Sequence, residues 1–318
     1  MEKMPIVKGL VSFIPGNQFL KKNEQGIGST NSALYCYSVW IKHLTMLWEN
    51  GLKEMPSRLG EIGPGGTLGV GLAAMLSGVD HYYALDVEKY SSPEENLKLL
   101  FELVELLKKR TPIKPGGWPD VTDYLDEDMF PGHILTDELL SGTLSDERID
   151  KIREAIMQSG SNNSDLTVTH IAPWSDSSII EKDTIDLIIS HSVMEHVNDI
   201  EMSYKAMAAW LKPGGYMSHQ IDLSAHSLTK KWNGHRQYPD FIWKVIVGKK
   251  PYLINREPCS VHLNLLRGNG FAELCQMKRY DNDSIEKSRL SSRWKNISED
   301  DLVCRGVFVQ VKSIACKD

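Results

Sequence analysis

The chain has 318 residues, of which 41% are hydrophobic and 25% are charged, enough for one large domain or two small ones. Its formal net charge of −6 argues against tight non-specific binding of nucleic acid by the whole chain, although it permits a local basic patch. No apolar run approaches the roughly 20 residues of a membrane span. The amino-terminal segment is interrupted by Lys8 and Gly9 and lacks a signal-peptide cleavage site, so we expect no leader.

Cysteine usage indicates a reducing compartment. The five cysteines are odd in number and widely spread, and no two of them form a CxxC pair. Neither a disulfide framework nor a zinc site is therefore indicated, and we expect a cytoplasmic protein.

In chain order, predicted strands alternate with predicted helices. This alternation favours an α/β fold with a doubly wound, mostly parallel sheet of seven strands, in which the last pair is free to be antiparallel. The predicted helices span 31–50 (capped by Thr30 or Asn31), 68–78, 92–110 (capped by Ser92), 145–160 (capped by Ser145), 199–210 and 261–271. The predicted strands span 58–63, 81–87, 165–172, 184–192, 216–223, 271–280 and 304–314.

Two segments interrupt this alternation. Residues 111–144 are rich in Pro, Gly and Asp, and residues 224–258 separate the fifth strand from the next helix. We interpret both as insertions that form the acceptor side of a domain spanning residues 57–318. Residues 1–56 are expected to form an amino-terminal helical segment or lid.

A glycine-rich turn follows the first strand in "LGEIGPGGTLGVGL". The dinucleotide fingerprint G-x-G-x-x-G would need a glycine at Leu68, so the sequence departs from it. Instead, Glu61 lies two positions before Gly63, and Gly65 follows. Glycines in such a turn let the backbone approach a ligand and adopt positive φ angles.

This acidic residue followed by G-x-G resembles the first motif of the class I S-adenosylmethionine-dependent methyltransferases. The segments "IDLIISHSVMEHV" and "WLKPGGYM" are similar to the family's fourth-strand motif and to the turn before its fifth strand. The resemblance covers residues 57–90 and 165–223 and implies a Rossmann-like fold with S-adenosylmethionine as the cofactor. A weaker similarity links the chain to bacterial methyltransferases of small-molecule or surface-sugar type.

The resemblance also implies a set of cofactor-binding residues. Asp86 ends the second strand, 23 positions after Gly63, where a carboxylate can accept hydrogen bonds from both ribose hydroxyls, although NAD sites use the same device. Trp174 follows the third strand, where the family places groups around the adenine. The full predicted set is Glu61, Gly63, Pro64, Gly65, Gly66, Asp86, Val87, Pro173, Trp174 and His191.

Candidate catalytic residues lie where strands four and five end. A hydroxyl acceptor gains from a base that removes its proton while the methyl group is transferred. His191 ends the fourth strand, and "SHQIDLSAHS" carries His219, Asp222 and His226. Residues 219 and 222 point to opposite faces of a straight strand, so they converge only if the strand bends or ends between them. A packed structural histidine remains the alternative at each position.

Glu195 and His196 raise the question of a metal. In the ubiquinone-biosynthesis O-methyltransferases, which this stretch resembles, an E-x-x-E-H run binds a divalent metal, but here Ser192 replaces the first Glu. The run "SVME" also has the form of a capping box, in which Ser192 caps a helix and Glu195 answers it. We therefore expect no metal.

The second insertion is basic and aromatic. Residues 230–256 carry seven Lys or Arg against one Asp, interleaved with Trp232, Tyr238, Phe241, Trp243 and Tyr252. A lid helix with a solvated basic face would explain this composition, as would an acceptor site for a flat, sugar-like or anionic molecule. Aromatic faces stack on sugars and bases, and Arg236 could hold a phosphate or carboxylate.

The functional prediction is methylation, most simply at oxygen, of a small molecule or a sugar-containing or anionic acceptor. Three alternatives stay open: an RNA methyltransferase using the basic aromatic insertion, a nicotinamide-dependent oxidoreductase, and a non-catalytic module that binds the cofactor. The acidic net charge disfavours the RNA alternative. The oligomeric state is not predicted.

Overall fold

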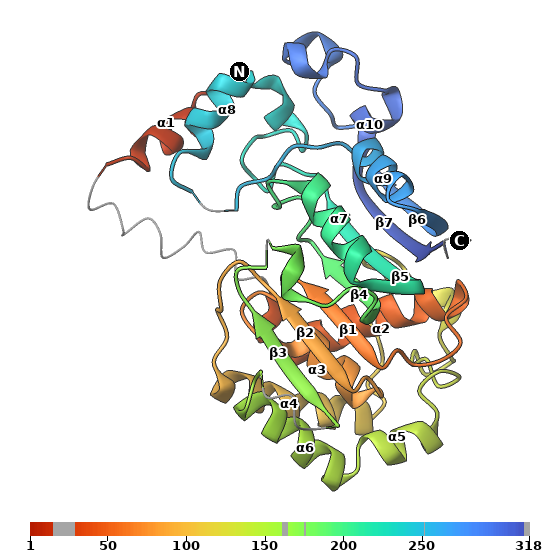
Figure 1. The fold of residues 1–318 in the computed structure, drawn as a ribbon. Coiled ribbons are helices and arrows are strands. Elements are labelled where there is room, and N and C mark those ends of the chain that lie inside the picture. The colour runs from red at the N-terminus through yellow and green to blue at the C-terminus, as the bar shows by residue number, and fades with distance from the viewer. Residues whose placement is uncertain (15–28, 161–164, 175, 251, 315–318) are drawn as a thin grey trace.

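The computed structural model describes residues 1–14, 29–160, 165–174, 176–250 and 252–314 (Figure 1). Seven strands form one sheet in the order β3-β2-β1-β4-β5-β7-β6. Strands β1 to β5 pair in parallel, and β7 is antiparallel to both of its neighbours. The predicted doubly wound, mostly parallel sheet is confirmed. The strands are β1 (Arg58–Ile62), β2 (His81–Leu85), β3 (Thr167–Ile171), β4 (Ile185–His191), β5 (Leu211–Asp222), β6 (Phe271–Tyr280) and β7 (Cys304–Ser313).

Helices cover both faces of the sheet. One hydrophobic core joins α2, α3, α4 and α6 to one face, and a second core joins α7 and α9 to the other. The helices are α1 (Met4–Val11), α2 (Ala33–Glu49), α3 (Gly69–Leu76), α4 (Pro93–Lys108), α5 (Asp137–Thr143), α6 (Asp146–Met157), α7 (Ile200–Trp210), α8 (Asp240–Val247), α9 (Cys259–Gly268) and α10 (Glu299–Val303).

Polar side chains define where several helices begin. Ser92 and Ser145 cap α4 and α6 as predicted, each by accepting a hydrogen bond from a backbone amide of the first turn. The predicted cap of α2 is wrong. Ser32, and neither Thr30 nor Asn31, accepts the amide hydrogen bond at the start of that helix. The helix therefore begins later than its apolar pattern suggests.

The strand order changes direction between β1 and β4. From β1, the chain continues to β2 and β3 on one side, whereas β4 and β5 lie on the other. The loops that follow β1 and β4 therefore leave the sheet in opposite directions. Open α/β sheets bind ligands at such a switch point, at the carboxyl ends of the strands. The Gly63 amide donates to the Leu85 carbonyl at 2.8 Å, so the glycine loop is joined to the end of β2.

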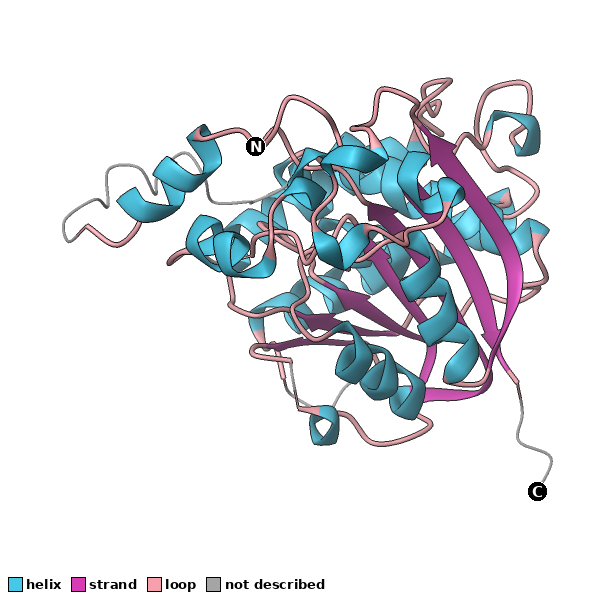
Figure 2. Ribbon diagram, turned by 90° about the horizontal axis from the view of Figure 1, so that it is seen from above, coloured by secondary structure: helices cyan, strands magenta, loops and turns pink. Residues whose placement is uncertain are grey.

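A small unit, which we call the cap, consists of α1 together with residues 224–258 and 281–303. α1 and α8 lie side by side (Figures 1 and 2), and a side chain on Gly9 would clash with the Val245 carbonyl. The Tyr238 hydroxyl donates to the Glu2 carbonyl at 2.9 Å. The sequence predicts the 224–258 insertion, but it gives no sign that α1 and residues 281–303 join it.

The first insertion, residues 111–144, has one part near the carboxyl edge of the sheet and another near the amino edge. The Trp118 ring lies against Phe308, and a Cβ atom on Gly306 would come within 3.5 Å of it. Gly306 pairs with Asp222 at the end of β5, so this part reaches the carboxyl edge. In contrast, α5 lies near the end of α3, where Thr143 approaches Gly78. Only the first part of residues 111–144 therefore approaches the predicted acceptor side.

Candidate active site at the carboxyl edge

The glycine loop requires residues without side chains. Gly63 has φ of +69° and Gly65 has φ of +75°, which is the left-handed region that glycine adopts without strain. A Cβ atom on Gly63 would lie 2.6 Å from the Val193 side chain, so the loop touches the turn that follows β4. Gly71 has a different use, because a side chain there would clash with the Tyr82 ring of β2. The loop glycines thus shape the edge, and Gly71 allows α3 to pack closely on the sheet.

Asp86 is held beside this loop. One carboxylate oxygen accepts from the Gly65 amide at 3.1 Å and the other from the Val87 amide at 2.7 Å. The residue is only 5% exposed, and burial raises the pKa of its carboxyl group. A carboxylate offers about four acceptor sites, so Asp86 retains capacity for a ligand hydroxyl. With Pro64 and Gly66 in the loop, this donor and acceptor set fits a nucleoside cofactor.

Glu61 lies beneath the loop. The Tyr82 hydroxyl donates to its carboxylate at 2.5 Å. Burial raises the pKa of Glu61 to about 7, and the hydrogen bond from Tyr82 opposes that shift. In this position the carboxyl group links β1 to β2 inside the fold.

Pro173 and Trp174 follow β3, and the Trp174 ring lies in the core. It is 6% exposed and meets the Trp210 ring edge-on, with centroids 6.4 Å apart. Its neighbours belong to the core shared with α7. The ring that the sequence assigns to the adenine is thus largely covered by protein.

His191 lies at the end of β4 and belongs to a buried polar chain. Its Nδ1 is 3.2 Å from Nε2 of His43, whose Nδ1 is 2.7 Å from the Ser218 hydroxyl. Burial lowers the pKa of His191 to about 4, and Lys42 adds to this effect. Burial also lowers the pKa of His43 well below its usual value, so both imidazoles are neutral at pH 7. Tyr35 of α2 meets the His191 ring edge-on, with centroids 6.1 Å apart.

His219 lies apart from the other predicted catalytic residues. It is fully buried, with Nδ1 2.8 Å from the Ser190 hydroxyl and its ring edge-on to Tyr204 of α7. Burial lowers its pKa to about 3. As the strand alternation requires, it points to the opposite face from Ser218, which contacts His43 of α2.

The capping-box prediction for Ser192 and Glu195 is wrong. Residues 193–196 form a turn, and α7 begins later with Asp199 as its cap. Ser192 has φ of +56°, and its hydroxyl donates to the Gln220 side chain at 2.7 Å. The side-chain amide of Asn255 donates to the carbonyls of residues 194 and 197, so these carbonyls are bonded outside any helix. Glu195 consequently has no cap to complete.

Glu195 instead converges with Asp222 and His226. Nε2 of His226 lies 3.9 Å from the Glu195 carboxylate and 3.8 Å from the Asp222 carboxylate. Glu195 is 2% exposed, and neither of its carboxylate oxygens has a hydrogen-bond partner. Burial raises its pKa well above the usual value. His196 meets the His226 ring edge-on, with centroids 4.9 Å apart.

Three aromatic side chains and both arginines of the second insertion lie inside the cap, whereas its lysines are exposed or half-buried. Arg236 is fully buried, donates to the Asp301 carbonyl at 2.8 Å, and lies over the rings of Trp232 and Trp294 at 5.8 Å each. Tyr238 is also fully buried, whereas Phe241 is 69% exposed. Arg236 is therefore part of the packing of the cap.

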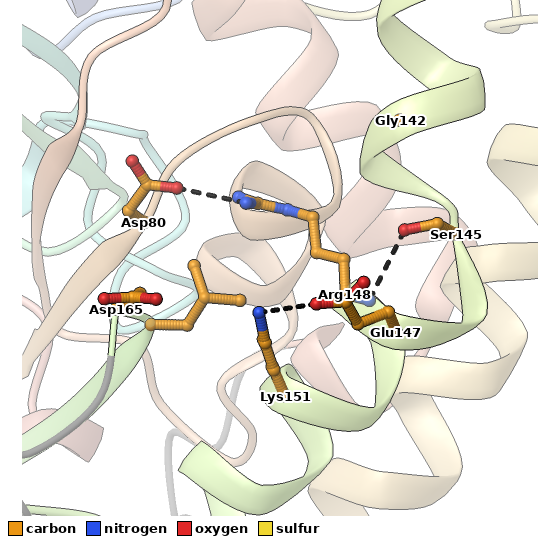
Figure 3. Close-up of a pocket in the computed structure, with 8 residues that line it drawn as sticks. Asp80, Gly142, Ser145, Glu147, Arg148, Lys151 and Asp165 are labelled. Atoms are coloured by element: carbon orange, nitrogen blue, oxygen red, sulfur yellow. Dashed lines mark hydrogen bonds and ion pairs between the residues drawn. The ribbon is translucent and has the colours of Figure 1, made fainter.

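A pocket of about 390 Å³ lies at the opposite, amino edge of the sheet, near the starts of β2 and β3 (Figure 3). Arg148 pairs with Asp80 at 3.1 Å and also donates to the carbonyls of Met75 and Val79. Lys151 pairs with Glu147 at 2.8 Å. Arg148, Asp80, Lys151 and Glu147 are thus bound to one another or to the backbone.

Sequence reasoning did not identify three residues of the carboxyl edge. Tyr35 and His43 come from α2, where helical periodicity predicts only core positions. Asn255 comes from the second insertion and fixes the turn after β4. No local motif marks these positions, because each acts on a strand end far away in the sequence.

Comparison with known proteins gives one family match and a set of similar folds. Residues 128–277 match the family model of a methyltransferase domain, which includes β3, β4 and β5. No curated protein matches. Similar solved structures include an S-adenosylmethionine-dependent methyltransferase from Mesorhizobium loti (14% identity, 84% of this chain and 95% of that chain, TM-score 0.40). Another, from Methanosarcina mazei, has 12% identity over 85% of this chain and 97% of that chain, with a TM-score of 0.44.

Among the helices in the described part of the chain, none combines the length and the apolar character needed to cross a bilayer.

Proposed function

We propose that this chain is a class I S-adenosylmethionine-dependent methyltransferase, as its methyltransferase-domain match supports, and that it methylates an oxygen atom of a small-molecule acceptor at the carboxyl edge of its sheet. The observation that carries the proposal is the convergence of Glu195, Asp222 and His226 beside the glycine loop. Gly63 touches Val193, two residues before Glu195, so the cofactor loop and this polar cluster are neighbours.

The cofactor supplies a methyl group on a sulfonium centre. In our proposal, Asp86 binds the ribose hydroxyls, and the loop of Gly63, Pro64, Gly65 and Gly66 allows the ligand to approach the backbone. The proposal gives Glu61 a supporting place beneath that loop, since its carboxylate is bound to Tyr82. Among the predicted residues, Val87 is 39% exposed beside Asp86, and we place it against the adenosine.

The acceptor side has two parts in this proposal. His191, held by His43, lines the region of the methyl group together with Tyr35. The cluster of Asp222, His226 and Glu195 lies beside the acceptor hydroxyl and promotes the loss of its proton. His226 is accessible for this task, because its side chain is 37% exposed. His219 is assigned no contact with substrate, because it is fully buried against α7.

The burial of aromatic residues supports a small acceptor over RNA. Binding of single-stranded RNA uses exposed aromatic faces beside a basic groove, whereas Trp232, Tyr238 and Trp243 are each less than 9% exposed. The net charge of −6 acts in the same direction. The match to a methyltransferase domain argues against the nicotinamide alternative.

The compartment and the acceptor class complete the proposal. The cysteines in the described residues are free thiols, which supports a cytoplasmic location. A hydroxylated acceptor such as a sugar fits a site that offers carboxylates and imidazoles as hydrogen-bond acceptors.

The test follows transfer of a labelled methyl group from S-adenosylmethionine. The purified protein is incubated with two fractions of a cell extract, the low-molecular-weight filtrate and the RNA. We expect label in the filtrate, in products stable to ribonuclease, and a large loss of that label with His226→Asn. Incorporation into ribonuclease-sensitive material alone would contradict the proposal.

A further inference from the structure

The polar cluster at the end of β5 has the composition of a metal site. Ligand atoms of Glu195, His196 and His226 all lie within 4.8 Å of one another. Asp222 adds a second carboxylate, 3.8 Å from Nε2 of His226. We propose that Glu195, His196 and His226, with Asp222, bind one divalent transition-metal cation. This inference deepens the proposed function, and it rests on that function only for the cation's role toward the acceptor.

The distances suit a shared cation. Two ligand atoms that each lie about 2.1 Å from one metal are at most about 4.2 Å apart. The separations of His226 from both carboxylates, 3.9 Å and 3.8 Å, already satisfy this limit. The 4.8 Å span of the group needs only a small contraction, of a size that side-chain rotation provides.

The tautomer of His196 is set correctly for a ligand. Its Nδ1 lies 2.7 Å from the carbonyl oxygen of Tyr252. A carbonyl only accepts hydrogen bonds, so Nδ1 carries the proton and Nε2 presents its lone pair. Metal-binding histidines usually have this arrangement, with the second ring nitrogen donating to a carbonyl or carboxylate.

Glu195 supplies an independent observation. Its carboxylate is 2% exposed and has no hydrogen-bond partner. A buried polar group without a partner is costly, and bound cations commonly account for such groups. Within the described part of the chain, no lysine or arginine forms a salt bridge with Glu195 or Asp222, whose only ionic partner is His226. The local charge is therefore available to a cation.

The ligand set also indicates which cation would bind. Imidazole nitrogens suit Zn²⁺ and Fe²⁺, and carboxylates suit Mn²⁺, so the mixed ligand set is compatible with each of these cations. Two of the four ligands, His226 and Asp222, lie outside the short run that carries Glu195 and His196. The site is thus assembled by the end of β5 and the start of the second insertion, and sequence spacing alone does not reveal it. A cation here would lower the pKa of an acceptor hydroxyl that it binds.

The experiment measures binding of Mn²⁺ to the chelator-treated, full-length protein, from the loss of the electron paramagnetic resonance signal of free Mn²⁺. We expect one ion per chain, displaced by Zn²⁺. Glu195→Gln and His226→Asn should each weaken binding at least 10-fold. His133→Asn is the matched control, because His133 is a part-exposed histidine that also lies beside two carboxylates, Glu49 and Asp126. Its removal should leave Mn²⁺ affinity unchanged.

Titration with S-adenosylhomocysteine on the same samples separates the possible failures. Retained affinity for this product shows that each variant is folded. Wild-type protein that binds the product but takes up no Mn²⁺ would overturn the metal site and leave the methyltransferase assignment standing. Unchanged Mn²⁺ binding in Glu195→Gln and His226→Asn would overturn the site equally. Failure of the wild-type protein to bind S-adenosylhomocysteine would instead count against the cofactor site.

Discussion

The two edges of the sheet are both rich in charged residues but differ in how these are satisfied. At the amino edge, Arg148 and Lys151 are paired with carboxylates or backbone carbonyls (Figure 3). At the carboxyl edge, the Glu195 carboxylate is buried without a partner, and a single histidine, His226, lies between it and Asp222.

This difference separates a structural role from a functional one. Paired charges at the amino edge join α6 to the loop between α3 and β2, which stabilises the fold. Unpartnered groups at the carboxyl edge cost stability, and proteins retain such groups where a ligand or a proton satisfies them. A pocket alone does not mark the functional edge, because the pocket of about 390 Å³ lies at the amino edge.

The largest expected effect is on turnover. His226→Asn should lower kcat by about 10² to 10⁴-fold, because it removes the group between the two carboxylates at the reacting edge. Affinity for S-adenosylhomocysteine should remain within a few-fold of wild type. Steady-state kinetics with any acceptor found in the labelled filtrate measures the change. Normal turnover in His226→Asn would contradict the assignment of catalysis to the carboxyl edge.

The next effect is on cofactor affinity. Asp86→Ala should weaken S-adenosylhomocysteine binding by about 100-fold or more, since it removes the proposed hydrogen bonds to the ribose and the bonds that Asp86 accepts from the Gly65 and Val87 amides. Isothermal titration calorimetry measures the change. Asp165→Ala at the amino edge is the matched control and should bind normally.

A smaller effect concerns stability and pH. The pKa of Glu61 is about 7 in the folded protein against 4.5 in an ordinary chain. The folded state therefore holds a proton that the unfolded state releases, and stability from this group declines as the pH rises from 4.5 through 7. The free energy of unfolding of Glu61→Gln, measured relative to wild type, should therefore rise by about 2 kcal/mol when the pH is raised from about 5 to about 8. Urea denaturation at the two pH values tests this; a pH-independent difference would contradict it.

The smallest effect is expected at the amino edge. Arg148→Met should cost about 1 to 2 kcal/mol of unfolding free energy, because it removes a partly exposed ion pair and hydrogen bonds to Met75 and Val79. Turnover and cofactor affinity should not change. Thermal denaturation together with kinetics checks both parts. Loss of activity in an Arg148→Met protein that remains folded would place the function at the amino edge and contradict this account.

Much of the fold follows from local patterns. Periodicity and caps predict the seven strands and the main helices, and the glycine turn with Asp86 predicts the cofactor edge. The sequence does not identify the residue that caps the start of α2. Three consecutive polar residues, Thr30, Asn31 and Ser32, can each serve there, and only the backbone geometry selects Ser32. The capping-box error at Ser192 has a similar cause, since Asn255, distant in sequence, binds the carbonyls of that turn.

The candidate site was only partly predictable. The sequence places His191, Asp222 and His226 at strand ends, but it cannot show that His219 points into the core or that Glu195 has no partner. Tyr35 and His43 reach the edge from α2 across the sheet, so their roles depend on helix packing. The small cap unit, in which α1 packs against the second insertion, likewise depends on contacts between α1 and α8, and no local pattern specifies these contacts.

Photo-crosslinking with methyl-labelled S-adenosylmethionine tests the central claim most directly. Ultraviolet irradiation of the bound complex is followed by proteolysis and mapping of the labelled peptides. Label in peptides that contain residues 61–90 or 190–196 would place the methyl donor at the carboxyl edge, as we predict. Label confined to peptides of α6 or of residues 165–170 would place the donor at the amino edge and contradict the account.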